Sequence, residues 1–337
     1  MSDARPSDLR EPQGGPGGAR GAAGRSWWLT AACAVGGAAL FAYVVRRAGV
    51  AEIIDGIQRV GWGLVTILVI AGLRFALRAQ CWRYCMPPSI ELTYGHALAA
   101  FLAGDAMGSV TPLGLLASEP TKVLLTRHHL ATRESIASLA AENVIYASSV
   151  SVFVALGLVV VLATVPLPVD WEWIIAGGIG AMLVAGVVGL RAMRGTWDAR
   201  RGARPAWRDR LATVRQTVVD FSAGHRQRLW NAFLLDMGFH GLGVLEAFLT
   251  LRWLLGDRSP TLVQAIAFEA LNRVVTVVFK FVPFRIGIDE AMSGAAAPAL
   301  ALNPAAGVAL AVVRKVRNLF WTGVGLAIVA AHPSKTR

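Results

Sequence analysis

Apolar runs about as long as a bilayer is thick recur along this 337-residue chain, and they restrict its fold more than any other feature. A helix that crosses a membrane needs about 20 mostly apolar residues. Runs of that kind occupy residues 27–45, 61–82, 94–125, 135–165, 174–190, 231–255, 261–282 and 305–331. Because lipid cannot satisfy exposed backbone groups, such runs must form helices. The sequence therefore predicts an all-α, polytopic integral membrane protein with about 8 transmembrane segments.

Charged residues are few and unevenly placed. They make up 16% of the chain, whereas soluble domains carry about 25%. The net charge of +12 comes from arginines clustered beside apolar runs. This pattern is typical of the positive-inside rule and of contacts with anionic phospholipids, and it argues against nucleic acid as a partner. The strongest cluster, residues 191–228, predicts a basic cytoplasmic loop that binds anionic phospholipids. Residues 1–26 predict a disordered cytoplasmic tail.

Residues 27–331 are expected to form a single membrane domain. Within it, residues 108–122 place two prolines, a carboxylate and a lysine inside otherwise membrane-like sequence. Backbone that is broken at Pro112 would leave polar groups unsatisfied in lipid, so this segment must be buried in protein or line a wet cavity. The sequence therefore predicts a broken or re-entrant helical hairpin around Pro112 and Glu119.

The outline of this segment recurs in the second half of the chain. Pro283 and Glu290 follow Pro112 and Glu119 by 171 positions in each case. The basic segments place the two copies on opposite sides of the membrane and both termini in the cytoplasm. Such a pattern indicates an inverted-topology repeat, whose broken helices form a site near the midplane. The two repeats are residues 27–165 and 174–331. Whether each break is a re-entrant hairpin or a pair of full spans stays open.

Ionisable residues inside apolar runs cost about 2.5–3.5 kcal/mol on insertion scales and therefore mark candidate functional sites. Glu119 and Glu290 have two interpretations. Each carboxylate binds a cationic headgroup or a coupling proton, or each accepts backbone N–H groups at its broken helix and fixes the loop. Arg314 and Arg317 share a face of the last helix and are suited to hold a phosphate. Alternatively, they pair internally with Glu290 or Glu142.

Other intramembrane charges have simpler interpretations. Glu269 and Arg273 are four residues apart on one helix and are expected to pair with one another. Arg74 and Arg78 share a helix face, and snorkelling toward the inner surface explains Arg78 better than Arg74. His240 is expected to be a buried hydrogen-bonding residue. These five residues are therefore left out of the predicted substrate site.

Several of these motifs together resemble a known family. Pro112, the segment Ser118-Glu-Pro-Thr-Lys122, Arg127 and Glu142 resemble the first signature of the flippase-like superfamily related to the transmembrane domain of lysylphosphatidylglycerol synthases. Pro283, the segment Ile286-Gly-Ile-Asp-Glu290 and Arg314 resemble its second signature. The Glu-Pro-x-Lys motif and the ending Arg-Lys-Val-Arg-Asn-Leu-Phe-Trp look closest to the hopanoid-biosynthesis-associated branch. The resemblance covers residues 27–331.

The chain departs from this family pattern at three places. Asn143 stands where the family usually has the arginine of a Glu-Arg pair. Ser118 replaces the glycine of a Gly-Glu pair, and Phe284 replaces the glycine of the usual Pro-Gly. The resemblance implies movement of lipids between leaflets, including aminoacylated or isoprenoid-linked lipids. These departures affect the positive charge of the site in the first repeat, where Asn143 replaces an arginine, and the identity of the ligand.

The sequence thus predicts a translocator of the bacterial inner membrane that moves an anionic or isoprenoid-type lipid between leaflets. Its expected substrate-binding residues are Glu119, Lys122, Arg127, Glu142, Glu290, Arg314 and Arg317, with Pro112 and Pro283 as structural breaks. The sequence contains no phosphate-cradling loop, metal cluster or catalytic constellation, so we expect no cofactor, no metal and no enzymatic activity. Lipid-biosynthesis enzymes or a second copy of the chain are further expected partners.

Two other classes of function stay open at this point. One is a non-transporting membrane scaffold that recruits lipid-modifying enzymes through the basic loop at residues 191–228. The other is an intramembrane transferase that uses Glu119 or Glu142 as a base.

Overall fold

The computed structural model describes residues 50–86, 92–111, 114–164, 225–279 and 281–331, with the single positions 46, 88, 177 and 180. Within these ranges it consists of helices and contains no strand. In chain order they are α2 (Val50–Val60), α3 (Gly63–Tyr84), α4 (Tyr94–Val110), α5 (Leu115–Thr126), α6 (Thr132–Thr164), α9 (Arg226–Leu255), α10 (Leu262–Val278), α11 (Ile288–Ala296) and α12 (Pro304–Ala331). Two 3₁₀ turns, η1 (Pro283–Arg285) and η2 (Pro298–Leu300), flank α11.

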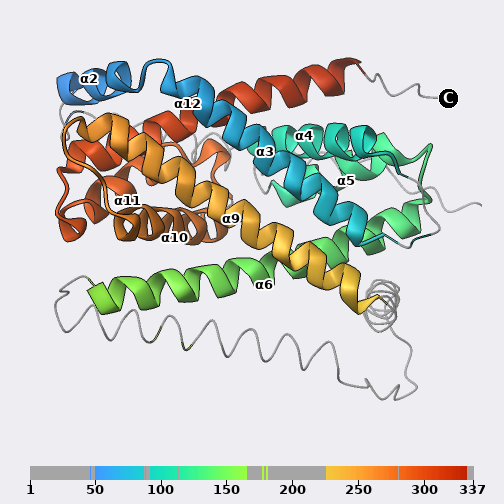
Figure 1. Cartoon of the computed structure of the whole chain (residues 1–337). Coiled ribbons are helices and arrows are strands. Elements are labelled where there is room, and N and C mark those ends of the chain that lie inside the picture. Colours follow the sequence, from blue (N-terminus) through green and yellow to red (C-terminus); the bar gives the residue numbers. More distant parts are fainter. Residues whose placement is uncertain are drawn as a thin grey trace, which may run out of the picture.

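The long helices α3 and α9 pack against one another through the middle of the bundle (Figure 1). Figure 1 also shows α6 along one side and α12 along the opposite side, with α4 and α5 at one end and α10 and α11 at the other. The order long helix, 17-residue helix, short helix, long helix occurs twice, as α3–α4–α5–α6 and as α9–α10–α11–α12. The contacts are reciprocal, because α4 packs on α12 and α10 packs on α6.

The two 17-residue helices begin at matching caps. The Thr93 side chain accepts a hydrogen bond from the backbone N–H of His96 at the start of α4, and Thr261 accepts one from the N–H of Gln264 at the start of α10. Gln264 in turn accepts a hydrogen bond from the Thr261 N–H at 2.8 Å, which completes a capping box. Because the caps satisfy backbone donors that a helix leaves unpaired, each helix has a defined start, and the break follows at its other end.

Three of the described helices, α3, α6 and α9, are long and apolar enough to cross a membrane. Both predicted interruptions are present. α4 ends at Val110 and α5 begins at Leu115, while η1, α11 and η2 follow α10 in place of one continuous helix. The last apolar run forms the single helix α12 despite its basic motif.

Several sequence predictions fall on parts of the chain that the structure does not describe. They are the tail at residues 1–26, the segment 27–45, the segment 174–190 apart from positions 177 and 180, Pro112, and the basic loop at 191–228 up to residue 224. The last residues of that loop begin α9, where Arg228 donates hydrogen bonds to the carbonyl oxygens of Tyr84 and Arg83 at the end of α3.

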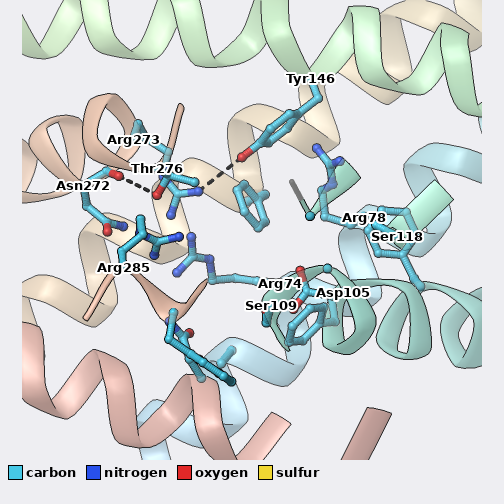
Figure 2. Close-up of a pocket in the computed structure, with 18 of the residues that line it drawn as sticks. Arg74, Arg78, Asp105, Ser109, Ser118, Tyr146, Asn272, Arg273, Thr276 and Arg285 are labelled. Carbon is cyan, nitrogen blue, oxygen red and sulfur yellow. Dashed lines mark hydrogen bonds between the residues drawn. The ribbon is translucent and has the colours of Figure 1, made fainter. Parts of the chain in front are cut away.

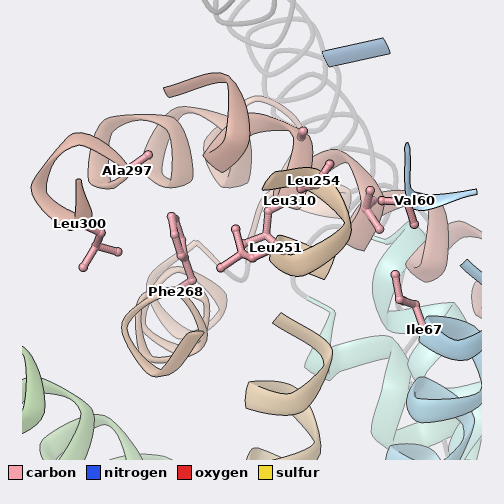
Figure 3. Packing of buried hydrophobic residues seen from close by; sticks show 10 residues of the cluster. Val60, Ile67, Leu251, Leu254, Phe268, Ala297, Leu300 and Leu310 are labelled. Atoms are coloured by element: carbon pink, nitrogen blue, oxygen red, sulfur yellow. The ribbon is translucent and has the colours of Figure 1, made fainter. Parts of the chain in front are cut away.

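Among the described residues, the largest apolar cluster lies where α10, α11 and α12 meet the ends of α2, α3 and α9 (Figure 3). Phe268 of α10 and Leu310 of α12 are almost fully buried in it, beside Ala297 at the end of α11. In a membrane the hydrophobic effect does not drive helices together, so close packing supplies the attraction. This cluster therefore holds in place the interrupted segment η1–α11–η2, which lies between α10 and α12 in the chain.

Small residues let α12 approach α4 closely. A Cβ added at Gly325 would overlap the backbone carbonyl oxygen of Leu102. Because the obstacle is backbone, the helices themselves must separate, and we expect Gly325→Ala to destabilise the protein by about 1–3 kcal/mol. Gly323→Ala is the matched control, since nothing lies within 4 Å of its added Cβ. Thermal unfolding of both variants in one detergent checks this, and equal melting temperatures would contradict it.

Candidate functional site

A cavity of about 290 Å³ lies where α3, α4, α5, α6, α9, α10, η1 and α12 meet (Figure 2). Its lining is unusually rich in charge. Six cations line it, namely Arg74, Arg78, Lys122, Arg273, Arg285 and Arg317. Two carboxylates, Asp105 and Glu119, also line it. The wall of the cavity is therefore strongly cationic, while further carboxylates lie behind the arginines.

One of the carboxylates behind the wall, Glu269 of α10, holds three arginines. It is fully buried and pairs with Arg273 at 2.6 Å, Arg314 at 2.9 Å and Arg74 at 3.3 Å. Gly243 of α9 makes room for this carboxylate, because a Cβ at that position would overlap a Glu269 oxygen. A glycine on the neighbouring helix is therefore part of what allows the charge to be buried.

A second buried glutamate, Glu246 of α9, pairs with Arg74 at 2.9 Å and with Arg317 of α12. Arg74 thus bridges Glu246 and Glu269, and the two clusters form one network. Four guanidinium groups share two carboxylates in it, which leaves a net positive charge. Unpaired buried charge is costly. An anion in the cavity would compensate this excess.

Arg78 has the opposite balance. Its guanidinium lies 2.5 Å from the Glu142 carboxylate of α6 and 3.5 Å from the Asp236 carboxylate of α9, and both acids are buried. The same group lies over the Tyr146 ring, 3.7 Å from its centroid, in a cation–π contact. Two acids therefore face one arginine, and the positive excess lies on the α10–α12 side of the cavity.

Lys122, on α5, is the cation that the first interrupted segment (residues 108–122) contributes to the cavity wall. The residue is 4% exposed, and its ammonium donates a hydrogen bond to Glu119 at 3.0 Å while lying 4.1 Å from the centroid of the Phe101 ring. The Glu119 side chain is 24% exposed, much more than any of the glutamates behind the wall. This pair is therefore easier to open than the buried ones.

Glu290, the counterpart of Glu119 in the second break, is placed differently. It is fully buried, accepts a hydrogen bond from the Gly287 N–H at 2.8 Å and pairs with Lys315 of α12 at 2.6 Å. It does not line the cavity. This geometry matches the interpretation in which the carboxylate fixes its own loop.

The structure brings part of the predicted substrate site to the cavity. Glu119, Lys122 and Arg317 line it. Glu142, Glu290 and Arg314 are buried behind it in ion pairs. Arg127 is exposed at the C-terminal end of α5 and lies away from the cavity. Pro283 begins η1.

Some contacts differ from the sequence-based interpretations. The internal partners of Arg314 and Arg317 are Glu269 and Glu246, not the predicted Glu290 and Glu142. Arg74 and Arg78 are buried and ion-paired, so the snorkelling interpretation is wrong. The predicted Glu269–Arg273 pair is present. His240 is fully buried and hydrogen-bonds to Ser149 at 3.2 Å, as predicted.

Sequence reasoning left several cavity residues out of the site. Arg74, Arg78, Asp105 and Arg285 line the cavity, and Glu246 and Asp236 support it from behind. Each of these charged residues lies within or beside an apolar run. Because a charge inside the membrane is costly, such residues are candidate functional residues from the sequence alone. The missing information was which residue lies opposite each charge, because the partners come from helices far apart in sequence.

An apolar groove of about 520 Å³ between α5 and α6 adjoins the cavity. Glu119 and Asn143 belong to the lining of both. The rest of the groove is lined by Pro120, Val123, Leu124, Arg127, Thr132, Ile136, Leu139 and Ala140. The polar cavity and the apolar groove are therefore adjacent and share two lining residues.

These features define a class of protein, a helical membrane bundle that encloses a cationic chamber. Among the residues that the structure describes, no group of three or more His, Cys, Asp or Glu side chains could hold a metal ion. Residues 29–325 match the family of the lysylphosphatidylglycerol synthase TM region. The chain belongs to this family and is a multi-pass membrane protein of lipid biology. Comparisons with curated proteins and with solved structures gave no match.

Proposed function

We propose that the protein is a lipid translocator that moves an anionic lipid between the leaflets of a bacterial inner membrane without changing it chemically. The observation that carries this proposal is the cavity with six cations and two carboxylates inside a membrane domain. Guanidinium groups bind phosphate oxygens bidentately and more strongly than neutral donors do. A phospholipid or an isoprenyl phosphate presents negative charge to the α10–α12 side of the cavity, where four guanidinium groups share the carboxylates of Glu246 and Glu269.

The groove between α5 and α6 supports a lipid as the cargo. Lipids need an apolar path for their chains as well as a polar site for their headgroups. The groove is apolar along most of its lining and shares Glu119 and Asn143 with the cavity. In this proposal the headgroup occupies the cavity and a hydrocarbon chain lies in the groove, open to the bilayer.

The reciprocal helix contacts support the inverted repeat. In such a repeat, α4 and α10 are equivalent, as are α6 and α12, and the pairs α4–α12 and α6–α10 are then the same contact made twice. Two such halves rocking about a central site would expose it to one leaflet at a time. We include in the proposal about 8 spans, with both termini cytoplasmic.

Two further parts of the proposal rest on sequence alone. The hopanoid-associated branch depends on the Glu-Pro-x-Lys motif at residues 119–122 and on the Arg-Lys-Val-Arg-Asn-Leu-Phe-Trp motif at residues 314–321. Lipid-biosynthesis enzymes and a second copy of the chain are proposed as partners, with anionic phospholipids at the basic loop. A pure scaffold would have no use for a buried cationic chamber, and for this reason we favour the translocator.

Leaflet-resolved transport in proteoliposomes tests the proposal. The full chain is reconstituted with trace fluorescent phosphatidylglycerol, isoprenyl phosphate or phosphatidylcholine, and a membrane-impermeant quencher reports the label in the outer leaflet. We expect faster exchange of one or both anionic lipids than in protein-free vesicles, and no acceleration of the zwitterionic lipid. Absence of acceleration for all three would contradict the proposal.

A further inference from the structure

Phe284 and Arg285, in the loop between α10 and α11, adopt a backbone conformation that favours glycine. Their φ angles are +50° and +48°, in the left-handed region. A side chain at such a position crowds the backbone, and two consecutive residues with this conformation are a local strain. Backbone strain of this kind persists only where surrounding contacts impose it, and it is concentrated at binding sites.

The surrounding contacts that impose the conformation are present. The Glu290 carboxylate accepts the Gly287 N–H on one side and pairs with Lys315 on the other. The Lys315 ammonium also donates a hydrogen bond to the carbonyl oxygen of Arg285 at 3.4 Å. The Arg285 guanidinium pairs with Asp289 at 3.0 Å, in the first turn of α11. The loop is therefore tied to both α11 and α12.

The strained pair faces the cavity. Phe284 and Arg285 both belong to its lining. Figure 2 shows the side chains of Arg285, Arg74 and Arg273 converging on the same part of the cavity from three different elements. Arg74 and Arg273 share the Glu269 carboxylate and Arg285 pairs with Asp289, so an anion that enters here competes with these carboxylates for the guanidinium groups.

Arg285 differs from the other arginines of the wall in its partner. The acids that hold Arg74, Arg78, Arg273 and Arg317 have side chains that are 1% exposed or less. The Asp289 side chain is 12% exposed and that of Arg285 is 20% exposed. Water can therefore solvate Asp289 when its partner leaves, and Arg285 is the wall arginine that can change partners at the lowest cost.

We propose that Phe284 and Arg285 form the selectivity element for the lipid headgroup. Arg285 exchanges Asp289 for the phosphate of the lipid, and the Phe284 ring packs on the carbon atoms next to that phosphate. This inference rests on the proposed function, because it assigns the cargo's anionic group to the same cavity. The shared ligand chemistry is a phosphate ester with a net negative charge next to a hydrocarbon chain, whether it belongs to an anionic glycerophospholipid or to an isoprenyl phosphate.

Binding of short, soluble lipids to the purified full chain in detergent tests the inference. The probes are dihexanoyl-phosphatidylglycerol, farnesyl phosphate and dihexanoyl-phosphatidylcholine, measured by isothermal titration calorimetry. We expect the wild type to prefer one or both anionic probes to the zwitterionic one. Phe284→Gly and Arg285→Met should each reduce that preference about tenfold. The anionic probe that loses most identifies the source of the phosphate.

Ala301→Gly is the matched control for strain. Ala301 also has a left-handed backbone, with φ +56°, but it is exposed after η2 and does not line the cavity. Glycine relieves the strain at either position, so we expect Ala301→Gly to raise the melting temperature by about 2–4 °C and Phe284→Gly not to lower it. Only Phe284→Gly should weaken anion binding. If the loop were purely structural, Phe284→Gly would leave anion binding as unchanged as Ala301→Gly does.

The outcomes are distinct. An unchanged preference in Phe284→Gly and Arg285→Met overturns the inference, as does a wild type that binds all three probes equally. A wild type that binds anionic probes through these residues but accelerates no lipid in proteoliposomes overturns the proposed function and leaves the selectivity element in place.

Discussion

Glu269→Ala is expected to destabilise the protein by about 3–5 kcal/mol and to prevent its accumulation in the membrane. The carboxylate is fully buried and is shared by Arg74, Arg273 and Arg314. Its removal deprives three almost fully buried guanidinium groups of this partner, and of the three only Arg74 keeps its ion pair with Glu246. Expression of a fluorescent fusion, followed by thermal unfolding in detergent, measures the effect.

Two companion variants make this result specific. Glu134→Ala removes an exposed carboxylate in the first turn of α6 and should leave expression and melting temperature unchanged. Glu269→Ala combined with Arg314→Met removes one of the stranded cations, which does not line the cavity, and should recover part of the lost stability. Wild-type accumulation of Glu269→Ala alone would show that the network does not hold the bundle together.

The helical architecture follows from local sequence, and for that reason it could be predicted. Apolar runs, prolines and a threonine before each 17-residue helix define where α4 and α10 begin and end. The repeat of Pro112 and Glu119 at Pro283 and Glu290 marked both interruptions. These signals act over a few residues, so no knowledge of tertiary contacts was needed.

The site could be predicted only in part, because its ion pairs join residues that are far apart in the sequence. Glu246 and Arg74 are 172 positions apart, and Glu269 and Arg74 are 195 positions apart. The spacing of Glu119 and Glu290 indicated equivalent roles. The structure gives one a partly exposed place in the cavity wall and the other a buried place behind it. The lysine partners also differ, because Lys315 reaches Glu290 from α12, whereas Glu119 pairs with Lys122 of its own helix.

The departures from the family pattern acquire a location in the structure. Phe284 stands where the family usually has glycine, yet its backbone keeps a conformation suited to glycine. Asn143 stands where the family usually has arginine, and it lies at the junction of the cavity and the groove. Both differences therefore concern surfaces that a lipid would contact, whereas the buried ion pairs fix the helices.

Lys122 offers the clearest separation between binding and folding. Its stem packs on α4 at Gly104, where an added Cβ would meet the lysine side chain, and its ammonium points to Glu119. Methionine has a similar length and fills the same space without charge. Glu119 is 24% exposed in its side chain, so it can be hydrated when the ammonium is lost. The fold should therefore tolerate the change.

We expect Lys122→Met to slow transport of the preferred anionic lipid about 10–100-fold, because a hydrogen bond to a charged group contributes about 1.5–3 kcal/mol. Arg133→Met is the matched control, since it removes an exposed cation in the first turn of α6, outside the lining of both the cavity and the groove. It should change transport less than twofold. Both variants should melt within about 2 °C of the wild type, because Glu119 can be hydrated when the ammonium is lost and the cation removed in the control is exposed. Equal losses of transport in the two variants would mean that overall positive charge near the membrane, and not the cavity, governs the movement of the lipid.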